Sequence, residues 1–145
     1  MMSVFKSMQI NTSGLNLERL KLDVISTNIA NVNTTRTEDG GPYKRKIVLF
    51  KENLVNETNR LSGANGMSSE GVKVTGIGED VSEFRMEYDP SHPDADENGY
   101  VAMPNINMVD EMIELIKTQR TYEANVTALN TSKSILKKAL EISKD

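Results

Sequence analysis

Apolar side chains recur about every seven positions near each end of the chain. The N-terminal repeat and its intermediate positions comprise Met8, Leu15, Leu20, Leu22, Ile25, Ile29 and Val32. The C-terminal repeat and its intermediate positions comprise Met108, Met112, Leu115, Tyr122, Val126, Leu129, Leu136 and Leu140. This spacing is typical of a helix that packs lengthwise against another helix. We therefore predict two long terminal helices.

The second helix also carries signals for its two ends. Pro104 precedes it, and Asn107 with Asp110 forms an arrangement that suits an N-cap. Acidic residues fill its first turns and lysines fill its last ones, as the helix dipole favours.

The middle of the chain has a different pattern. β-branched and aromatic runs, or near alternation of apolar and polar residues, predict short strands within Tyr43–Lys51, Val72–Ile77 and Phe84–Tyr88. A turn-rich piece lies at 62–66, and Lys51–Leu61 fits neither helix nor strand clearly. We predict an α+β fold, with two long terminal helices packed as a coiled-coil-like pair and a small β-rich central insert.

These elements suggest a division of the chain into three segments. We expect an N-terminal helix over 1–35, a β-rich and loop insert over 36–104, and a C-terminal helix over 105–145. The two helices would together form one discontinuous helical domain.

The composition limits how much core the chain can build. Its 145 residues include no Trp, three Phe and 37% apolar residues, which is below the usual apolar share. Burying two large side chains per heptad contributes less free energy than ordering that heptad's backbone costs. We therefore expect the chain's ends to be weakly folded in a monomer and to become ordered by packing with neighbouring subunits.

Charge and hydropathy argue against several classes of protein. The net charge is −4 and the densest basic run is only Lys44–Lys46, so we expect no nucleic-acid binding. The chain has no cysteine. Its longest apolar run, Ile47–Phe50, is the length of a strand, so we expect no membrane span. No continuous apolar segment of a cleavable signal peptide is visible, which predicts a cytoplasmic protein or one exported by another route.

One acidic segment is a candidate metal site. Asp94–Gly99 matches the opening of a calcium loop, D-x-D-x-N-G. The twelfth loop position, where a bidentate Glu is needed, is Asn105, and Pro104 stands before it. A plain acidic turn explains the segment better.

Catalytic motifs are also missing from the sequence. His92 is the only histidine, and no nucleophile elbow, phosphate loop or dinucleotide fingerprint occurs. We expect no enzymatic activity, no cofactor, no metal site and no small-molecule substrate. A calcium-responsive helical regulator and a soluble helical adaptor are the alternatives from other classes.

Three asparagines interrupt the N-terminal helix where its apolar face continues. They are Asn28, Asn31 and Asn33, beside Ile29 and Val32. Asparagine favours caps and turns over helix interiors. The amides of Asn28 and Asn31 lie three residues apart on one face. They can fix register by bonding a neighbouring chain or the turn that follows, or they can simply cap their own helix.

Several segments together resemble the bacterial flagellar axial proteins, which include rod and hook subunits. Asn28–Thr34 is similar to the ANVNT motif near the N-terminus of these proteins, and Thr35–Arg45 is similar to its continuation in proximal-rod members. The narrower likeness is supported by Tyr88–Pro93, Gly99–Asn107 and Arg120–Val126. The segment Asn53–Ser69 is matched least.

The resemblance implies a structural subunit of the proximal flagellar basal-body rod that assembles helically with other axial proteins. Its implied partners are other rod subunits, the basal ring and the export apparatus. Its implied location is the periplasmic rod, reached through the flagellar type III apparatus without cleavage. Another rod or hook subunit is the alternative within the family.

Helical assembly joins different surfaces of successive subunits. We expect subunit packing to use Met8, Leu15, Leu22, Ile25, Asn28, Ile29, Asn31, Val32, Asn33, Met112, Leu115, Tyr122, Asn125, Val126, Leu129, Leu136 and Leu140.

Overall fold

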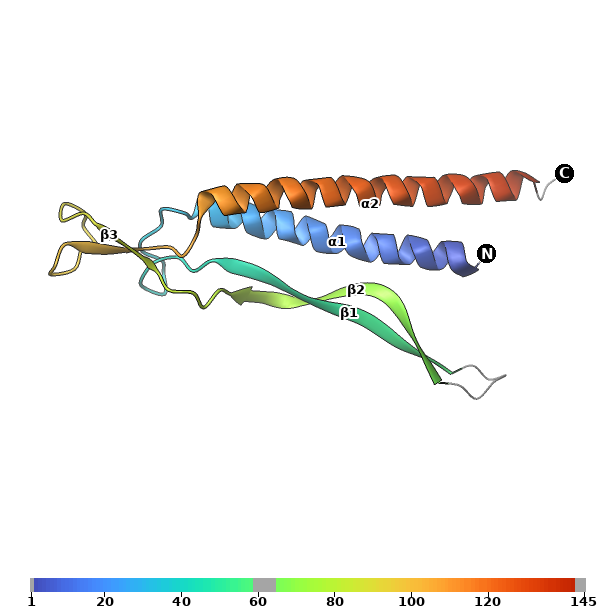
Figure 1. Cartoon of the computed structure of the whole chain (residues 1–145), viewed down its shortest axis with the longest axis horizontal. Coiled ribbons are helices and arrows are strands. Elements are labelled where there is room, and N and C mark those ends of the chain that lie inside the picture. The colour runs from blue at the N-terminus through green and yellow to red at the C-terminus, as the bar shows by residue number, and fades with distance from the viewer. Residues whose placement is uncertain (1, 59–64, 143–145) are drawn as a thin grey trace. The chain divides into compact units, whose positions relative to one another are not determined.

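The computed structural model describes residues 2–58 and 65–142, and it describes side chains for residues 5–54 and 69–142. It contains two long helices with strands between them in the sequence (Figure 1). The elements in chain order are α1 (Met2–Ala30), β1 (Lys46–Thr58), β2 (Asn65–Glu79), β3 (Arg85–Tyr88), β4 (Tyr100–Met103) and α2 (Met108–Ile142). The predicted α+β fold is confirmed.

Asparagines lie at the C-terminal end of α1 and at the N-terminal end of α2. The Oδ1 of Asn107 accepts a 3.0 Å hydrogen bond from the backbone N–H of Val109, which is the N-cap that the sequence predicts. Helix α1 ends at Ala30, earlier than the expected residue 35. The turn that follows is closed by the backbone N–H of Thr34, which bonds the carbonyl of Asn31.

The strands form two separate sheets. β1 and β2 are neighbours in one two-stranded sheet, and β3 pairs antiparallel with β4 in the other. The second pairing aligns Arg85 with Met103 and Tyr88 with Tyr100. The ambiguous segment 51–61 is strand as far as Thr58, and β4 is a strand that the sequence pattern did not predict. Much of the turn predicted at 62–66 lies outside the described residues.

The chain divides into two compact units. Unit 1 comprises 1–20, 49–76 and 118–145, and unit 2 comprises 21–48 and 77–117. Neither unit is continuous in sequence. The expected organisation of the terminal helices into one discontinuous domain stays a prediction.

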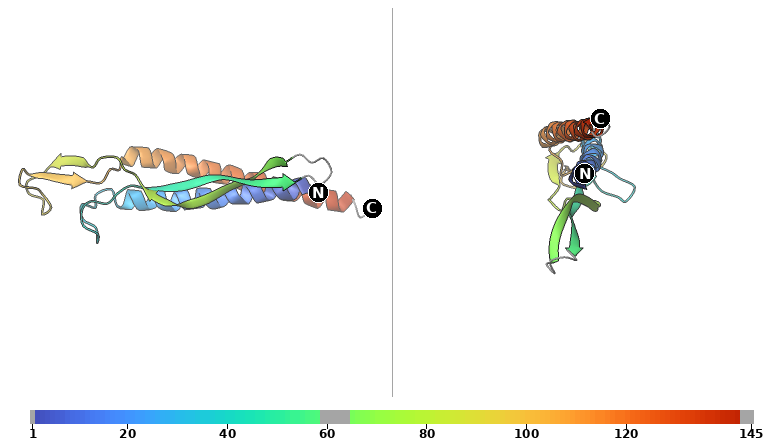
Figure 2. Two further views of the ribbon diagram at one scale, coloured as in Figure 1. Left: turned by 90° about the horizontal axis from the view of Figure 1, so that it is seen from below. Right: turned by 90° about the vertical axis from the view of Figure 1, so that its right-hand side faces the viewer.

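Within unit 1, α1 lies between α2 and the sheet formed by β1 and β2 (Figure 2). A Cβ on Gly14 would lie 3.0 Å from the Nδ2 of Asn125, so the glycine allows the two helices to approach closely. On the other side, Ser13 Oγ accepts a 3.1 Å bond from the N–H of Val72 in β2 and donates to the carbonyl of Ile10. Gly71 has φ of +95°, and a Cβ there would lie 2.2 Å from Ser13 Oγ. The close approach therefore requires glycine.

The buried side chains are unevenly divided between the units. Among the residues with described side chains, those buried in unit 1 are Leu17, Glu18 and Thr118. Those buried in unit 2 include Val24, Ile25, Asn28, Tyr43, Val101, Ile106 and Glu111. Unit 2 therefore contains most of the core that this chain forms by itself.

Candidate functional site

The end of α1 is anchored in unit 2 by the fully bonded amide of Asn28. Its side chain is 1% exposed. The Nδ2 donates to the carbonyl of Lys46 at 2.9 Å and to Glu111 Oε2 at 3.1 Å. The Oδ1 accepts from the N–H of Lys46 at 2.9 Å and from the hydroxyl of Tyr43 at 3.2 Å. All four hydrogen-bonding positions of the amide are used, so Asn28 joins α1, the start of β1 and α2.

A charged pair completes this arrangement. Arg45 Nε donates to Glu111 Oε1 at 2.6 Å, and Arg45 Nη1 lies 3.3 Å from Asp80 Oδ2. The side chain of Glu111 is 1% exposed, whereas those of Arg45 and Asp80 are about 30% exposed. We call Asn28, Tyr43, Arg45, Asp80 and Glu111 the Asn28 cluster.

The environment of the cluster shifts the pKa of three of its groups. Burial raises the pKa of Tyr43, and the negative charges of Glu111 and Glu79 raise it further. Burial alone would lower the pKa of Arg45, but hydrogen bonds and charge from Glu111 and Asp80 outweigh it and raise that pKa. The pKa of Asp80 is lowered, first by hydrogen bonds from the backbone and hydroxyl of Ser82 and then by Arg45. The cluster is therefore stabilised in one charge state, as a structural ion pair would be.

Asn105 supports the same cluster from the segment before α2. Its Oδ1 accepts a 2.8 Å bond from the N–H of Arg45. Its Nδ2 lies 3.2 Å from the carbonyl of Asp80, and 3.2 and 3.0 Å from the carbonyl and hydroxyl oxygens of Ser82. Among the described residues, no buried side-chain nitrogen or oxygen lacks a hydrogen-bond partner. The arrangement thus fixes the backbone segments around Arg45, Asp80 and Ser82 relative to one another.

The other two asparagines lie in different surroundings. Asn31 Nδ2 donates to the carbonyl of Thr27 at 2.8 Å, and its Oδ1 accepts from the hydroxyl of Thr34 at 3.2 Å. Asn31 therefore bonds its own helix end and the turn that follows. Asn33 is exposed and lines a cavity of about 160 Å³ with Glu87, Asp89, His92, Val101 and Met103.

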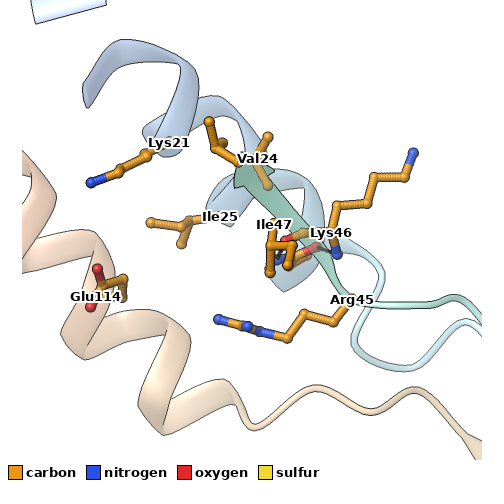
Figure 3. A pocket seen from close by; sticks show the side chains of 9 residues that line it. Lys21, Val24, Ile25, Arg45, Lys46, Ile47 and Glu114 are labelled. Atoms are coloured by element: carbon orange, nitrogen blue, oxygen red, sulfur yellow. Dashed lines mark hydrogen bonds between the residues drawn. The ribbon is translucent and has the colours of Figure 1, made fainter. Parts of the chain in front are cut away.

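A second cavity, of about 170 Å³, adjoins the Asn28 cluster (Figure 3). Its apolar side chains are Val24, Ile25, Ile47 and Val48, and its polar ones are Lys21, Asn28, Arg45, Lys46 and Glu114. Figure 3 shows the Arg45 side chain extending toward α2 beneath Ile25. The Arg45 and Asn28 side chains in its wall already have hydrogen-bond partners. We therefore interpret the cavity as a gap in side-chain packing rather than as a ligand site.

The residues predicted to pack subunits have mixed exposure. Ile25 and Asn28 are buried within their own chain, and Asn33, Met112 and Leu140 are exposed. The half-buried ones are Met8, Leu15, Leu22, Ile29, Asn31, Val32, Leu115, Tyr122, Asn125, Val126, Leu129 and Leu136. Their role in contacts between subunits stays a prediction.

The acidic segment Asp94–Gly99 uses its carboxylates to close a turn. Asp96 Oδ1 accepts 2.8 Å bonds from the N–H groups of Asn98 and Tyr100. Asp94 Oδ2 accepts from the hydroxyl of Thr35 at 2.8 Å. Within the described ranges, no three His, Asp or Glu side chains gather as a metal site would require.

Sequence reasoning missed most of the Asn28 cluster. Arg45 belongs to the basic run Lys44–Lys46, in which nothing indicates burial, yet it is half-buried and ion-paired. A signal for Glu111 did exist, because it lies four residues before Leu115 of the predicted apolar repeat and therefore on the same face of α2. A charged residue on a packed face indicates a buried partner. Nothing in the sequence identified Arg45 as that partner.

Neither described helix is both long enough and apolar enough to cross a bilayer.

Comparison with known proteins identifies the family. The profile for "Flagella basal body rod protein" matches residues 8–36, and "Flagellar basal body rod FlgEFG protein C-terminal" matches residues 97–142. The flagellar basal-body rod protein FlgC of Borreliella burgdorferi is 43% identical, over 97% of this chain and 98% of the relative. The FlgC proteins of Bacillus subtilis and Salmonella typhimurium are 42% and 35% identical, over 99% and 97% of this chain and 100% and 98% of theirs. The chain therefore belongs to the FlgC family of flagellar basal-body rod proteins and is a structural rod subunit of the flagellar basal body.

Proposed function

We propose that this subunit builds the proximal part of the rod by helical assembly with copies of itself and other axial proteins, and that it has no catalytic role. The observation that carries the proposal is the amount of apolar surface that its own fold leaves uncovered. On α2 alone, Met112, Ile113 and Ile116 each expose about half of their surface. Large contiguous apolar patches on a protein mark sites of association.

The distribution of buried residues supports a specific division of labour. The Asn28 cluster and most of the buried apolar side chains lie in unit 2. Unit 1 contains the N-terminal part of α1 and the C-terminal part of α2 but few buried side chains. Unit 2 would therefore fold in each subunit, whereas the helical ends of unit 1 would become ordered mainly by contacts in the assembled rod.

The partners and location follow from the same proposal. The chain would contact other rod subunits, the basal ring and the export apparatus, and it would occupy the periplasmic rod. It would reach that place through the flagellar export apparatus with its N-terminus uncleaved. Nucleic acid, cofactors and small-molecule substrates have no part in this proposal.

Deletion of the gene tests the proposal in the bacterium itself. Basal bodies isolated from the deletion strain should lack a complete rod, and the cells should be non-motile until the intact chain is supplied. Mass spectrometry of complemented basal bodies should find the chain with its uncleaved mass. Normal rods in the deletion strain would overturn the assembly role, and a shortened N-terminus would overturn export without cleavage.

Calcium titration calorimetry of the purified chain separates this proposal from the regulatory alternative. The engaged carboxylates of Asp94 and Asp96 favour an outcome with no site-specific heat. Saturable calcium binding that changes the helix content would favour a calcium-responsive regulator.

A further inference from the structure

The first turns of α2, in unit 2, expose an apolar patch. Its members expose between 44% and 63% of their surface and are Met108, Val109, Met112, Ile113 and Ile116. Their spacing of one, three and four residues places them on one face of the helix. The opposite face carries buried Glu111 and Thr118. We call this surface the N-patch.

The N-patch ends abruptly along the helix. On the next turns, the same face carries Gln119, Arg120 and Glu123, all exposed. The side-chain Nε2 of Gln119 donates a 3.3 Å hydrogen bond to Glu123 Oε1. An apolar patch with a polar boundary is typical of a defined contact rather than of a general helix surface.

A second apolar surface lies near the C-terminal end of α2, in unit 1. It is one open face of the helix, formed by Thr131, Ser134, Ile135, Lys138, Ala139 and Ile142. Ile135 and Ile142 are 55% and 77% exposed. We call this surface the C-patch.

The helix segments that carry the two patches have opposite charges. Residues 108–116 contain three acids and no base, which gives −3, and residues 133–142 contain three lysines and one acid, which gives +2. Within the chain, Glu111 pairs with Arg45, Glu114 with Lys117, and Lys138 with Glu141. Exposed Asp110, Lys133 and Lys137 make no ion pair within the described part of the chain. The N-patch thus lies beside an unpaired acid, and the C-patch lies beside two unpaired lysines.

We propose that the N-patch of one copy packs against the C-patch of a second copy. The inference rests on the proposed function, since it names the surfaces that join like subunits in the rod. Two different surfaces meet in this contact, so it is heterologous and can extend as an open helical series. Apolar burial would supply most of its affinity, and the opposed charges would select the pairing.

Cysteine cross-linking between two populations of the chain tests this contact, because the chain contains no cysteine of its own. One population carries Met112→Cys and the other, with a different tag, carries Ala139→Cys. We expect oxidation of the mixture to give a disulfide dimer that carries both tags. Its yield should be severalfold higher than in a control mixture with Gln119→Cys in place of Met112→Cys. All three positions are on the surface of α2, so the substitutions should leave the fold intact.

Charge reversal provides an independent measure in the same assay. Asp110→Lys in the first population should lower the yield, as should Lys133→Glu with Lys137→Glu in the second. The two reversed populations mixed together should recover it. A yield equal to that of the Gln119→Cys control, or no recovery in the doubly reversed mixture, would overturn the proposal.

The same pairs are then oxidised in cells, and basal bodies are isolated. A rod that contains the chain but links Met112→Cys only to a different rod protein would overturn the inference and leave the assembly role intact. Basal bodies that lack the chain would overturn the assembly role, and the solution assay would still decide the contact.

Discussion

The guanidinium Nε of Arg45 donates a 2.6 Å hydrogen bond to Oε1 of Glu111, whose side chain is 1% exposed. The two residues are 66 positions apart in the sequence. Their contact joins the start of β1 to the first turns of α2, and Asn28 adds the end of α1 through a bond to the other carboxylate oxygen. This pair connects three elements of unit 2 at one point.

Glu111→Gln tests the contribution of that pair to stability. The substitution removes the more buried of the two carboxylates that compensate half-buried Arg45, so we expect unit 2 to lose about 2–4 kcal/mol. Hydrogen exchange of peptides from 21–48 and 77–117 measures this loss. Glu114→Gln is the matched control on the same helix, since the Glu114 side chain is 42% exposed and lies 3.7 Å from Lys117, and it should change stability by less than about 0.5 kcal/mol. Equal effects of the two substitutions would contradict the structural role of Glu111.

The raised pKa of Tyr43 predicts a dependence of stability on alkaline pH. Burial, with the charges of Glu111 and Glu79, favours the protonated phenol in the folded state. This contribution to stability is fully present below the ordinary tyrosine pKa of 10.0 and is lost as pH rises through the higher folded pKa. Ultraviolet absorbance titration should show one tyrosine ionising late, and Tyr43→Phe should remove that late transition. A late transition that persists in Tyr43→Phe would assign the shift to another tyrosine.

Gly71→Ala should weaken the packing of β2 against α1 in unit 1. The positive φ of +95° and the 2.2 Å approach of a Cβ to Ser13 Oγ predict a loss of about 2–3 kcal/mol. Gly76→Ala is the control in the same strand, because a Cβ there meets nothing within 4 Å. Exchange of the α1 amides near Ser13, measured in assembled rods, should accelerate in Gly71→Ala only. Unchanged exchange would show that the strand moves freely to accommodate the methyl group.

Asn31→Leu separates a capping role from a role between subunits. Its bonds to the carbonyl of Thr27 and the hydroxyl of Thr34 predict a loss of about 1 kcal/mol if it only caps its helix. Thr34→Val removes one of those bonds and leaves the amide in place. If Asn31 also fixes register with a neighbour, Asn31→Leu should abolish swimming in soft agar while Thr34→Val retains it. Normal motility of the Asn31→Leu strain would defeat the register hypothesis.

The helices could be predicted because their signal is local and repeated, but the depth of burial could not. Leu15 and Leu22 belong to the predicted repeat and are half-buried, whereas Leu17 and Val24, also seven residues apart, are buried. In unit 1, α1 packs against both α2 and a sheet (Figure 2). A helix with two neighbours buries a face that a single heptad repeat does not describe.

The Asn28 cluster could not be predicted, because it depends on pairs far apart in the sequence. The bond from Asn28 to Glu111 spans 83 residues, and no local pattern records such a pairing. Strand β4 was missed for a different reason. Tyr100–Met103 is a continuous run of four apolar residues, so it shows no alternation of apolar and polar positions.

Hydrogen exchange of the dilute monomer, compared with the chain in isolated rods, tests most directly whether assembly orders the ends of this subunit. We predict that amides in 5–20 and 118–142 exchange rapidly in the monomer and become protected in the rod, while those of unit 2 are protected in both. A dilute monomer with both helical ends fully protected, and with a single cooperative melt by circular dichroism, would contradict the account.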